Sequence, residues 1–428
     1  MLEGKTTTKT VAAYIPTLIG KGIGAIADQG LFASSNFLFN LLLVRLLPPK
    51  EYGIFTIAYS AILLLGTIHT AVVIEPMLVF GAGKYSKDLK PYVLFLLNLH
   101  AGFSAILLLL IGIISITLWI SELHELAMLI FVTTASGLMV LFLWLIRRLY
   151  YIKMHFQYSA VGGLAYAVIL LGGVAVVHMM GLLTPIASML ILGSASALIG
   201  FLLLLVFLRS TDTSECQILL PRQAWADHWS YARWSIPGSV FMWIPGNLYY
   251  VLLPVWSGLE LSGILKAMMN LIMPALQINT ALAMLFIPFF SRAKKRGYIK
   301  KAITSSLLIA TGISVIYWII ISVCSTTLLL HIYGEYYVKY AQYLYILGTV
   351  PIFTGVIAVL GAYLRAEIKP RAIFWAYSSA SLVSTLLGLT YLAKLGIYGG
   401  ALGTLFNYLV ITLFLAWYTY KGTTNNGG

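Results

Sequence analysis

Charged residues are scarce in this sequence. Only 9% of its 428 residues are Asp, Glu, Lys or Arg, whereas 60% are hydrophobic. A soluble protein of this length needs far more charge on its surface, so the composition excludes a soluble globular enzyme or binding module. Polar stretches are short as well, none longer than about 25 residues, which is too little for an independent soluble domain.

Cysteine is also nearly absent. The chain contains two, Cys216 and Cys324, which lie far apart and lack the spacing of metal ligands. Such a pair gives no evidence of a disulfide framework or a zinc site, and we expect neither a metal nor another cofactor.

Apolar runs of about 20 residues, in contrast, recur along the whole length. They predict an all-α, polytopic membrane protein with twelve transmembrane helices. No small-residue cleavage site follows the basic N-terminal segment, so the first span is expected to be an uncleaved helix. The predicted spans are 22–46, 54–80, 92–119, 125–148, 158–180, 184–208, 232–256, 262–290, 302–323, 341–364, 372–393 and 399–420.

Basic residues are distributed unevenly between the two sides of these spans. Of the 27, 22 lie in the terminal segments and every second loop, four lie on the opposite side (Arg45, Lys50, Lys339 and Lys394), and Lys266 falls within a span. By the positive-inside rule, this bias predicts that both termini are cytoplasmic. The net charge of +14 is then explained by topology and by contact with anionic lipid, and nucleic-acid binding is not expected.

The two halves of the sequence resemble each other. EYGIFTIAYS at 51–60 and ELSGILKAMMN at 260–270 each begin the second helix of a half. The basic loops IRRLYYIKMHFQYSA at 146–160 and YLRAEIKPRAIFWA at 363–376 also correspond. The pattern therefore indicates a six-helix unit that is used twice.

Because six is even, both copies have the same orientation in the membrane. We predict two parallel six-helix bundles, residues 1–208 and 232–428, around a central cavity, which is a transporter architecture. The segment 209–231 is the predicted linker. Its part PRQAWADHWSYARW is amphipathic and is expected to lie on the cytoplasmic membrane surface.

Polar residues line one face of the first span. At 100° per residue, Gln29, Asn36 and Asn40 fall within roughly 40° of one another, with Asp28 and Ser35 at the edge. Facing lipid, each would lose its hydrogen bonds at a cost of several kcal/mol. They either bond to neighbouring helices or line a cavity. Asp28, Gln29, Asn36 and Asn40 are our candidate cavity residues.

Lys266 lies inside the otherwise apolar run SGILKAMMNLIMPAL. A charged group near mid-membrane costs about 2.5–3.5 kcal/mol on insertion scales. The ammonium group either reaches outward to the external surface or faces the space between the halves and meets an anion. Asn247 on the preceding helix suits sugar hydroxyls, but ordinary packing would explain it equally well, and Asn270 shares the helix of Lys266. Lys266, Asn247 and Asn270 are further candidate cavity residues.

Two Pro-Gly pairs interrupt the seventh span, at Pro237 and Pro245. Each proline removes a backbone hydrogen bond, so the pairs predict either a static bend or a hinge. Glu75 precedes a proline near the cytoplasmic end of the second span. It is either a proton or cation site or the partner of a lysine in the next loop. Asp28 and Glu75 are the candidate ion-coupling residues.

The N-terminal string DQGLFASSNFLFNLLLVRLLPPKEYGIFTIAYSAILLL, with its acidic-polar helix and Pro-x-Glu-Tyr-Gly turn, resembles the start of polysaccharide-export flippases. These are the O-antigen (Wzx-type) members of the multidrug/oligosaccharidyl-lipid/polysaccharide (MOP) exporter superfamily. The strings YARWSIPGSVFMWIPGNLYYVLL and SGILKAMMNLIMPALQINTALAMLFIPFFSR resemble the start of their second half. The resemblance covers both halves and implies a MATE/MOP-like fold.

The resemblance implies a flippase of the bacterial inner membrane. It would move an undecaprenyl-pyrophosphate-linked oligosaccharide, such as an O-antigen unit, from the cytoplasmic to the outer leaflet by alternating access, coupled to an ion gradient. Lys266 would offset the desolvation of the pyrophosphate, and polar groups of the first helix would meet the sugar. The implied partners are the lipid-linked oligosaccharide, membrane lipid, a polysaccharide polymerase and chain-length proteins. The candidate phosphate contacts near helix ends are Arg45, Arg147, Arg148, Arg233 and Arg365.

Two other functions stay open. A cation-coupled drug or metabolite exporter of the same superfamily would favour acidic residues in its cavity. Here the acidic candidates are Asp28 and Glu75 and the basic one is Lys266, which favours an anionic lipid as the substrate. A membrane polymerase, ligase or glycosyltransferase would need a sizeable loop with catalytic groups. The longest external loop, roughly 324–340, is short, and no DxD or paired-carboxylate motif is present, so we do not expect an enzyme. A lipid II flippase would carry two further helices.

Overall fold

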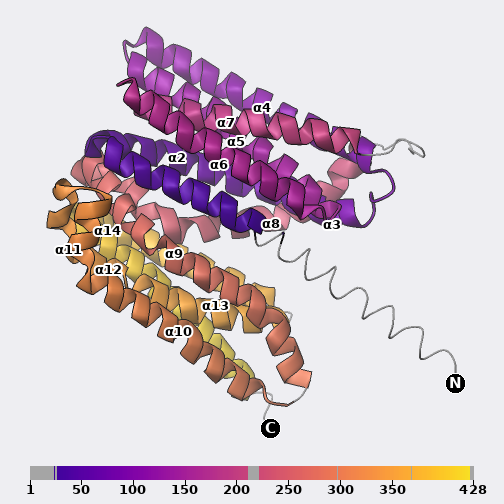
Figure 1. Ribbon diagram of the computed structural model, residues 1–428. Coiled ribbons are helices and arrows are strands. Elements are labelled where there is room, and N and C mark those ends of the chain that lie inside the picture. Colours follow the sequence, from indigo (N-terminus) through magenta and orange to yellow (C-terminus); the bar gives the residue numbers. More distant parts are fainter. Residues whose placement is uncertain (1–23, 25–26, 211–220, 296, 368, 425–428) are drawn as a thin grey trace. The chain divides into compact units, whose positions relative to one another are not determined.

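The computed structural model describes residues 24, 27–210, 221–295, 297–367 and 369–424 (Figure 1). Throughout this described part, every regular element is helical and no strand is present. The predicted all-α, polytopic membrane fold is confirmed. Both termini lie outside the described residues, so their cytoplasmic location stays a prediction.

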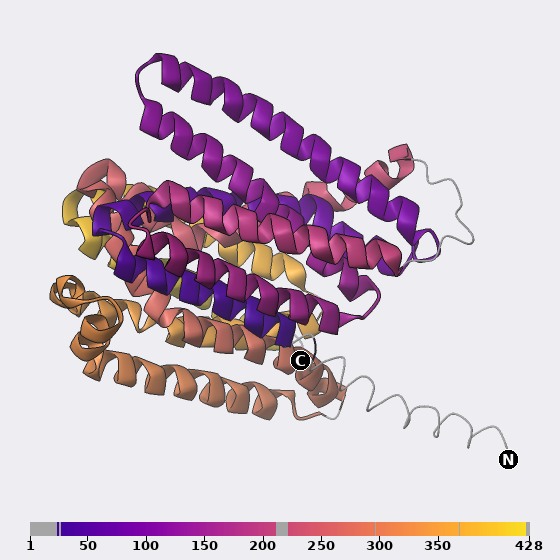
Figure 2. The ribbon, with the colours of Figure 1, turned by 45° about the horizontal axis from the view of Figure 1, so that its top comes forward.

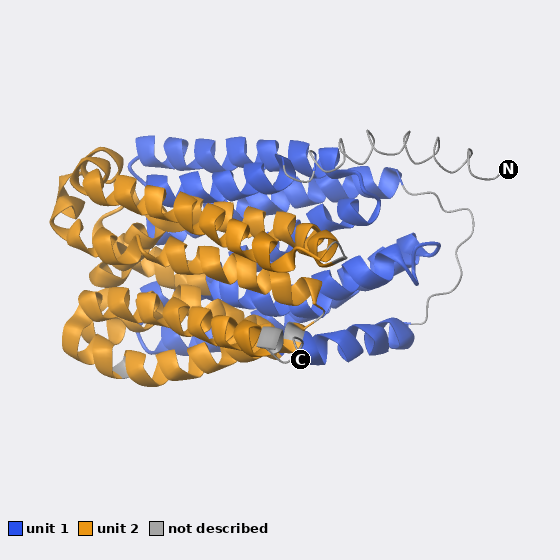
Figure 3. Ribbon diagram, turned by 90° about the horizontal axis from the view of Figure 1, so that it is seen from below, with its two compact units in different colours: residues 1–42, 61–236 blue, residues 43–60, 237–428 orange. Residues whose placement is uncertain are grey.

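The chain divides into two compact units, coloured separately in Figure 3. Unit 1 comprises residues 1–42 and 61–236, and unit 2 comprises residues 43–60 and 237–428. The short segment 43–60, which contains the start of the second span, therefore belongs to unit 2.

Unit 1 contains the first helix, which runs over residues 27–46, as far as residue 42, and then the chain from residue 61 to residue 236 in the middle of α8. α5 packs against α4 and α7, and α6 packs against α7 (Figure 2). A Cβ atom on Gly193 of α7 would lie 2.8 Å from Ser136 Cα of α5, so a missing side chain permits this close approach. The elements that lie wholly or partly in unit 1 are α2 (Pro49–His69), η1 (Thr70–Ile74), α3 (Glu75–Ala82), α4 (Leu89–Ile120), α5 (His124–Ile152), α6 (Phe156–Met179), α7 (Pro185–Arg209) and α8 (Pro221–Leu252).

Unit 2 is organised around α13, which packs against α9, α10 and α14. Two long helices bend sharply at glycines with positive φ, α9 at Gly258 (φ 83°) and α14 at Gly396 (φ 53°). The bend in α14 separates the eleventh and twelfth predicted spans. The remaining elements are α9 (Pro254–Lys295), α10 (Ile299–Val323), α11 (Ser325–Ile332), η2 (Glu335–Tyr340), α12 (Gln342–Leu347), α13 (Val350–Ala366) and α14 (Pro370–Thr424).

Nine helices in the described residues are long and apolar enough to cross a membrane. The three other predicted spans are also helical where they are described. The first, 22–46, begins outside the described residues, whereas 232–256 lies largely in α8 and 372–393 lies in α14.

The second span contains a π-helical turn that its sequence does not predict. α2, η1 and α3 form one continuous helix over Pro49–Ala82, but η1 is a π-helix of five residues. A π-helical turn widens the helix, breaks the ordinary hydrogen-bond ladder and is frequent at functional sites. His69 immediately precedes this turn.

The last part of the predicted linker is helical. α8 begins at Pro221, within the linker, and continues without a break into the seventh predicted span. Its amphipathic first turns bury Ala224 and His228 in unit 1 and expose Trp225 and Trp229. His228 contacts the backbone oxygen of Val72 in η1 at 3.0 Å. This part of α8 is thus attached to the π-helix.

A second attachment of α8 is electrostatic. Lys84 Nζ lies 2.6 Å from Asp227 Oδ2, to which Tyr85 also donates a hydrogen bond of 2.5 Å. Burial opposes ionisation of Asp227, but the hydrogen bonds from Lys84 and Tyr85 outweigh it and hold the pKa of this carboxyl below its usual range. The contact joins the loop after α3 to α8.

Candidate functional site

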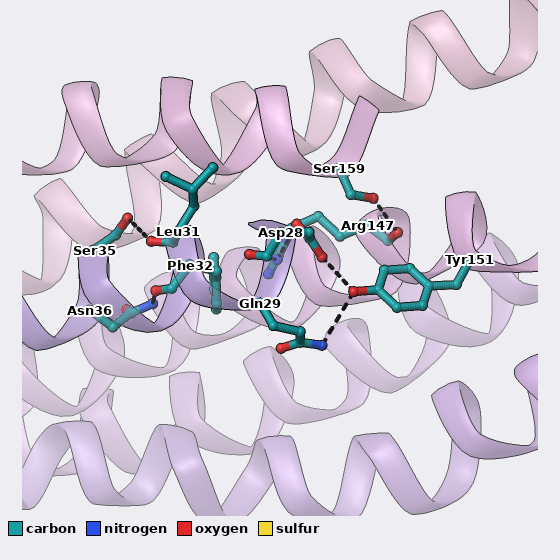
Figure 4. Close-up of polar contacts among 9 residues, drawn as sticks. All are labelled: Asp28, Gln29, Leu31, Phe32, Ser35, Asn36, Arg147, Tyr151 and Ser159. Carbon is teal, nitrogen blue, oxygen red and sulfur yellow. Dashed lines mark hydrogen bonds and ion pairs between the residues drawn. The ribbon is translucent and has the colours of Figure 1, made fainter. Parts of the chain in front are cut away.

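A buried charge cluster joins the first helix to α5 in unit 1 (Figure 4). Arg147 Nη2 donates to Asp28 Oδ1 at 2.5 Å, and Tyr151 Oη donates to Asp28 Oδ2 at 2.7 Å. Asp28 is 1% exposed and Arg147 6%. Because both carboxylate oxygens are bonded, Asp28 is neutralised by a partner within the protein.

An aromatic ring contacts the Arg147 side chain, and a hydroxyl binds its backbone. The guanidinium carbon of Arg147 lies 3.8 Å from the ring centroid of Phe32, in a cation–π arrangement. Ser159 donates to the Arg147 backbone oxygen at 2.9 Å. Among the described residues, Arg147 Nε is buried without a hydrogen-bond partner. The guanidinium is therefore held by the Asp28 carboxylate and the Phe32 ring.

The neighbouring Arg148 supplies a second positive charge. Its guanidinium lies over the Tyr151 ring, 4.6 Å from the centroid. Gln29 can use its amide in two orientations: one donates to Tyr151 Oη at 3.3 Å, and the other accepts from Arg148 at 2.6 and 2.8 Å. The charges of Arg147 and Asp28 cancel each other. The cluster of Asp28, Arg147 and Arg148 therefore has a formal charge of +1.

A pocket of about 240 Å³ opens beside this cluster. Its wall therefore combines two guanidinium groups, an amide and a hydroxyl with aromatic surface, and η1 contributes Thr70 and Ile74. Such a wall can bind an anion through charge-assisted hydrogen bonds. The lining residues are Gln29, Phe32, Thr70, Ile74, Trp144, Arg147 and Arg148.

The structure brings four predicted site residues together here, namely Asp28, Gln29, Arg147 and Arg148. Asn36 and Asn40 lie further along the first helix and bond mainly to it. Asn36 donates to the Phe32 backbone oxygen at 2.8 Å, and Asn40 to that of Asn36 at 2.9 Å. The Oδ1 atom of Asn40 is buried and has no partner among the described residues. These bonds lie within the first helix and match neither expected alternative, bonding to neighbouring helices or cavity lining. Asn36 also has one interhelical bond, because Tyr166 of α6 donates to its Oδ1 at 3.3 Å.

Lys266 lies in unit 2 and is 9% exposed. Its Nζ atom is 3.3 Å from Tyr250 Oη and 4.7 Å from the centroid of the same ring. No carboxylate forms an ion pair with it in the part of the chain that the structure describes. Tyr250 in turn donates to Asn247, and Asn270 donates to Tyr52 at 2.9 Å.

Three predicted phosphate contacts lie elsewhere and are exposed. Arg45 donates to the backbone oxygens of His331 and Ile332, at 2.5 and 3.2 Å, and so caps the end of α11. Arg233 lies over the Trp234 ring, with its guanidinium carbon 5.7 Å from the centroid. Arg365 is near the end of α13. A role in phosphate binding stays a prediction for all three.

Glu75 and the two prolines complete the predicted set. Glu75 accepts a 2.5 Å hydrogen bond from Ser235 of α8, whereas the lysine of the next loop, Lys84, pairs with Asp227. Pro237 and Pro245 lie inside α8, which stays helical through both. Whether they form a hinge stays a prediction, as does the central cavity between the two bundles.

Sequence reasoning missed the pairing of Asp28 with Arg147 and the part played by Tyr151. Arg147 was grouped with loop cations near helix ends, because periodicity does not show which helix a residue faces across a bundle. A usable signal was present. Asp28 and Arg147 each lie within an apolar helix, and burying either charge alone in lipid would cost free energy unless the two side chains formed an ion pair.

Comparisons with known proteins address the fold. No protein-family model matches the sequence, and neither does any curated protein. Solved structures match nearly the whole chain at low identity. An inward-facing MATE multidrug resistance transporter of the MOP superfamily aligns with a TM-score of 0.76 at 12% identity, covering 94% of this chain and 98% of that one.

Two further solved structures extend the comparison. The lipid II flippase MurJ, in an inward closed conformation, aligns with a TM-score of 0.73 at 14% identity, covering 94% of this chain and 87% of MurJ. A MOP superfamily transporter from Pyrococcus furiosus, reported to have a binding pocket of reverse polarity, aligns with a TM-score of 0.64 at 14% identity and 95% coverage of both chains. The chain therefore has the fold of MOP-superfamily transporters.

Proposed function

We propose that this protein is a flippase for a polyprenyl-pyrophosphate-linked oligosaccharide, such as an O-antigen or other surface polysaccharide unit. It moves the lipid from the cytoplasmic to the outer leaflet of a bacterial inner membrane by alternating access, driven by an ion gradient. A polysaccharide polymerase with its chain-length proteins would then consume the flipped unit. The shared fold supports transport as the general activity, and the chemistry of unit 1 supports an anionic lipid as the cargo.

The observation that carries this proposal is the excess positive charge at the pocket beside η1. Arg148 lines the pocket and has no carboxylate partner among the described residues, while Arg147 is balanced by Asp28. A pyrophosphate must be desolvated to cross the membrane, and guanidinium groups bind phosphate oxygens through bidentate hydrogen bonds. Lys266 in unit 2 is a further cation, and none of the carboxylates in the described residues forms an ion pair with it.

The same geometry argues against a cationic drug as the cargo. An exporter of cations needs an available carboxylate, but both oxygens of Asp28 are bonded by Arg147 and Tyr151. Glu75 is bonded by Ser235 and does not line this pocket. The charge that the pocket offers to a ligand is therefore positive.

The test is transport by the purified protein in proteoliposomes, with a fluorescent undecaprenyl-pyrophosphate oligosaccharide as the cargo. Arg148→Ala should lower the rate by about tenfold or more, because a hydrogen bond to a charged group contributes roughly 1.5–3 kcal/mol. Arg148→Lys should lose less, since it keeps the charge but not the bidentate geometry.

Arg209→Ala is the matched control, because Arg209 is an exposed arginine in the same unit that lies outside the pocket. It should transport at the wild-type rate. The proposal is wrong if folded Arg148→Ala protein transports normally, or if the wild-type protein exports cationic dyes and leaves the lipid in place.

A further inference from the structure

A second pocket, of about 320 Å³, lies on a different face of η1 from the pocket lined by Arg147 and Arg148, which we call the cationic pocket. His69, Val72 and Val73 contribute to it, whereas Thr70 and Ile74 contribute to the cationic pocket. Apart from His69 and Asn98, its side chains are hydrocarbon or aromatic. The lining residues are His69, Val72, Val73, Asn98, Leu99, Gly102, Phe103, Ile106 and Trp225.

This apolar pocket opens on the outer face of α4. Leu99, Phe103 and Ile106 follow one another at helical spacing, so they form a single stripe along α4. Ile106 is 62% exposed, and the stripe continues into the exposed Leu109 and Ile113. In a membrane, such a surface faces hydrocarbon, so the pocket is accessible to lipid chains.

Gly102 leaves room at the centre of this stripe. A Cβ atom built on Gly102 has no neighbour within 4 Å, so the position borders open space. The absent side chain therefore widens the pocket at the point where a chain could enter from the bilayer.

His69 adds a feature that a bulk-lipid surface would not have. It is 1% exposed, and its Nδ1 atom has no hydrogen-bond partner among the described residues. His69 Nε2 lies 3.2 Å from His100 Nδ1, and Ser104 Oγ lies 3.5 Å from His100 Nε2. If Ser104 donates to His100, His100 donates to His69, and His69 Nδ1 is left with a buried proton and no acceptor.

We propose that this pocket binds the polyprenyl chain of the transported lipid, close to the cationic pocket on the same five-residue π-helix. The inference rests on the proposed function. An isoprenoid chain carries a double bond in every five-carbon unit, whereas a saturated acyl chain carries none. Its π electrons are a weak acceptor for a proton on His69 Nδ1, which is where the proton lies when Ser104 donates to His100. η1 thus separates a site for the charged headgroup from a site for its apolar chain.

The experiment compares two probes on the full chain in nanodiscs. One is an undecaprenyl-pyrophosphate oligosaccharide, and the other is the same oligosaccharide pyrophosphate on a two-isoprene chain. Gly102→Leu fills the pocket and should weaken binding of the long probe by about tenfold, equivalent to roughly two buried methylene groups, without changing binding of the short probe. If Gly102→Leu fails to fold, Ile106→Trp at the pocket mouth serves instead.

Gly112→Leu is the control, because Gly112 is on α4 outside the pocket and also has open space at its Cβ. It should bind both probes like the wild type. The inference is overturned if Gly102→Leu and Gly112→Leu bind the long probe equally well. The proposed function stays intact in that case if the short probe still binds. Displacement of the long probe by excess phosphatidylglycerol also overturns it, since any acyl chain would then suffice. Failure of both probes to bind the wild type would instead refute the proposed function.

Discussion

At the scale of single residues, the Asp28–Arg147 pair changes how the polar first helix is interpreted. Asp28 was a candidate for ion coupling because a lone carboxylate in an apolar helix requires a functional reason. With Arg147 at 2.5 Å and Tyr151 at 2.7 Å, its charge has a structural reason. The cation that stays available at the pocket is Arg148. A buried ion pair positions its members more reliably than it stabilises a fold.

We expect removal of one partner of this pair to be much more harmful than removal of both. Arg147→Ala should lower the free energy of unfolding by about 3–5 kcal/mol, because it leaves the Asp28 carboxylate buried and unpaired. The double variant Asp28→Leu/Arg147→Met should recover most of this loss. Thermal unfolding of the purified protein in detergent measures both. A double variant as unstable as Arg147→Ala would show that the pair is not the cause.

At the scale of helices, the internal repeat corresponds to a physical contact in unit 2. The strings EYGIF and LSGIL place Gly53 on α2 and Gly263 on α9 at equivalent positions. A Cβ atom on Gly263 would lie 2.8 Å from Gly53 N and 2.9 Å from Pro49 O. On Gly53 it would lie 1.9 Å from Leu259 O. The two backbones touch because neither helix carries a side chain there, which is a common basis of helix packing in membranes.

A methyl group at this crossing should therefore separate the helices. Gly263→Ala is expected to cost about 1–3 kcal/mol of stability, since the clash is with backbone atoms that cannot rotate away. Gly112→Ala in α4 meets nothing within 4 Å and should instead be neutral or stabilising by up to about 1 kcal/mol, the helix preference of alanine over glycine. Paired melting temperatures of the two variants test the contrast. Equal effects would mean that the crossing tolerates a side chain.

At the scale of the whole molecule, the fold is that of MOP-superfamily transporters, and the chain forms two compact units. The orientation in the membrane rests on the 22-to-4 distribution of basic residues. Of the positions that define it, Lys87 lies on the predicted cytoplasmic side and Lys394 on the external side, and both are exposed in the structure.

Cysteine labelling in intact cells tests that orientation. In a background with Cys216 and Cys324 replaced by serine, Lys394→Cys should react with a membrane-impermeant maleimide. Lys87→Cys should react only after the membrane is permeabilised, because positive loops are retained in the cytoplasm. The reverse pattern would place the termini outside and reverse the proposed direction of transport.

Much of the fold could be predicted because it depends on local patterns. The spans follow from apolar length, and the repeat follows from similar strings at corresponding positions. The site was only partly predictable. Asp28 and Gln29 were identified as polar groups that lipid would not tolerate, and Arg148 as a phosphate contact near a helix end, but Tyr151 and the π-helix η1 gave no periodic signal.

The sequence by itself determined that the chain is a helical membrane protein, where its helices lie and which residues must avoid lipid. These properties depend on the cost of placing each side chain in hydrocarbon, which is a property of the residue and its neighbours along the chain. Only the tertiary structure decided that Asp28 meets Arg147, that Gly53 meets Gly263 and that two pockets open beside η1. The physical reason is that each of these depends on which helices are neighbours and how they are rotated, and these are set by packing between residues that are distant in sequence.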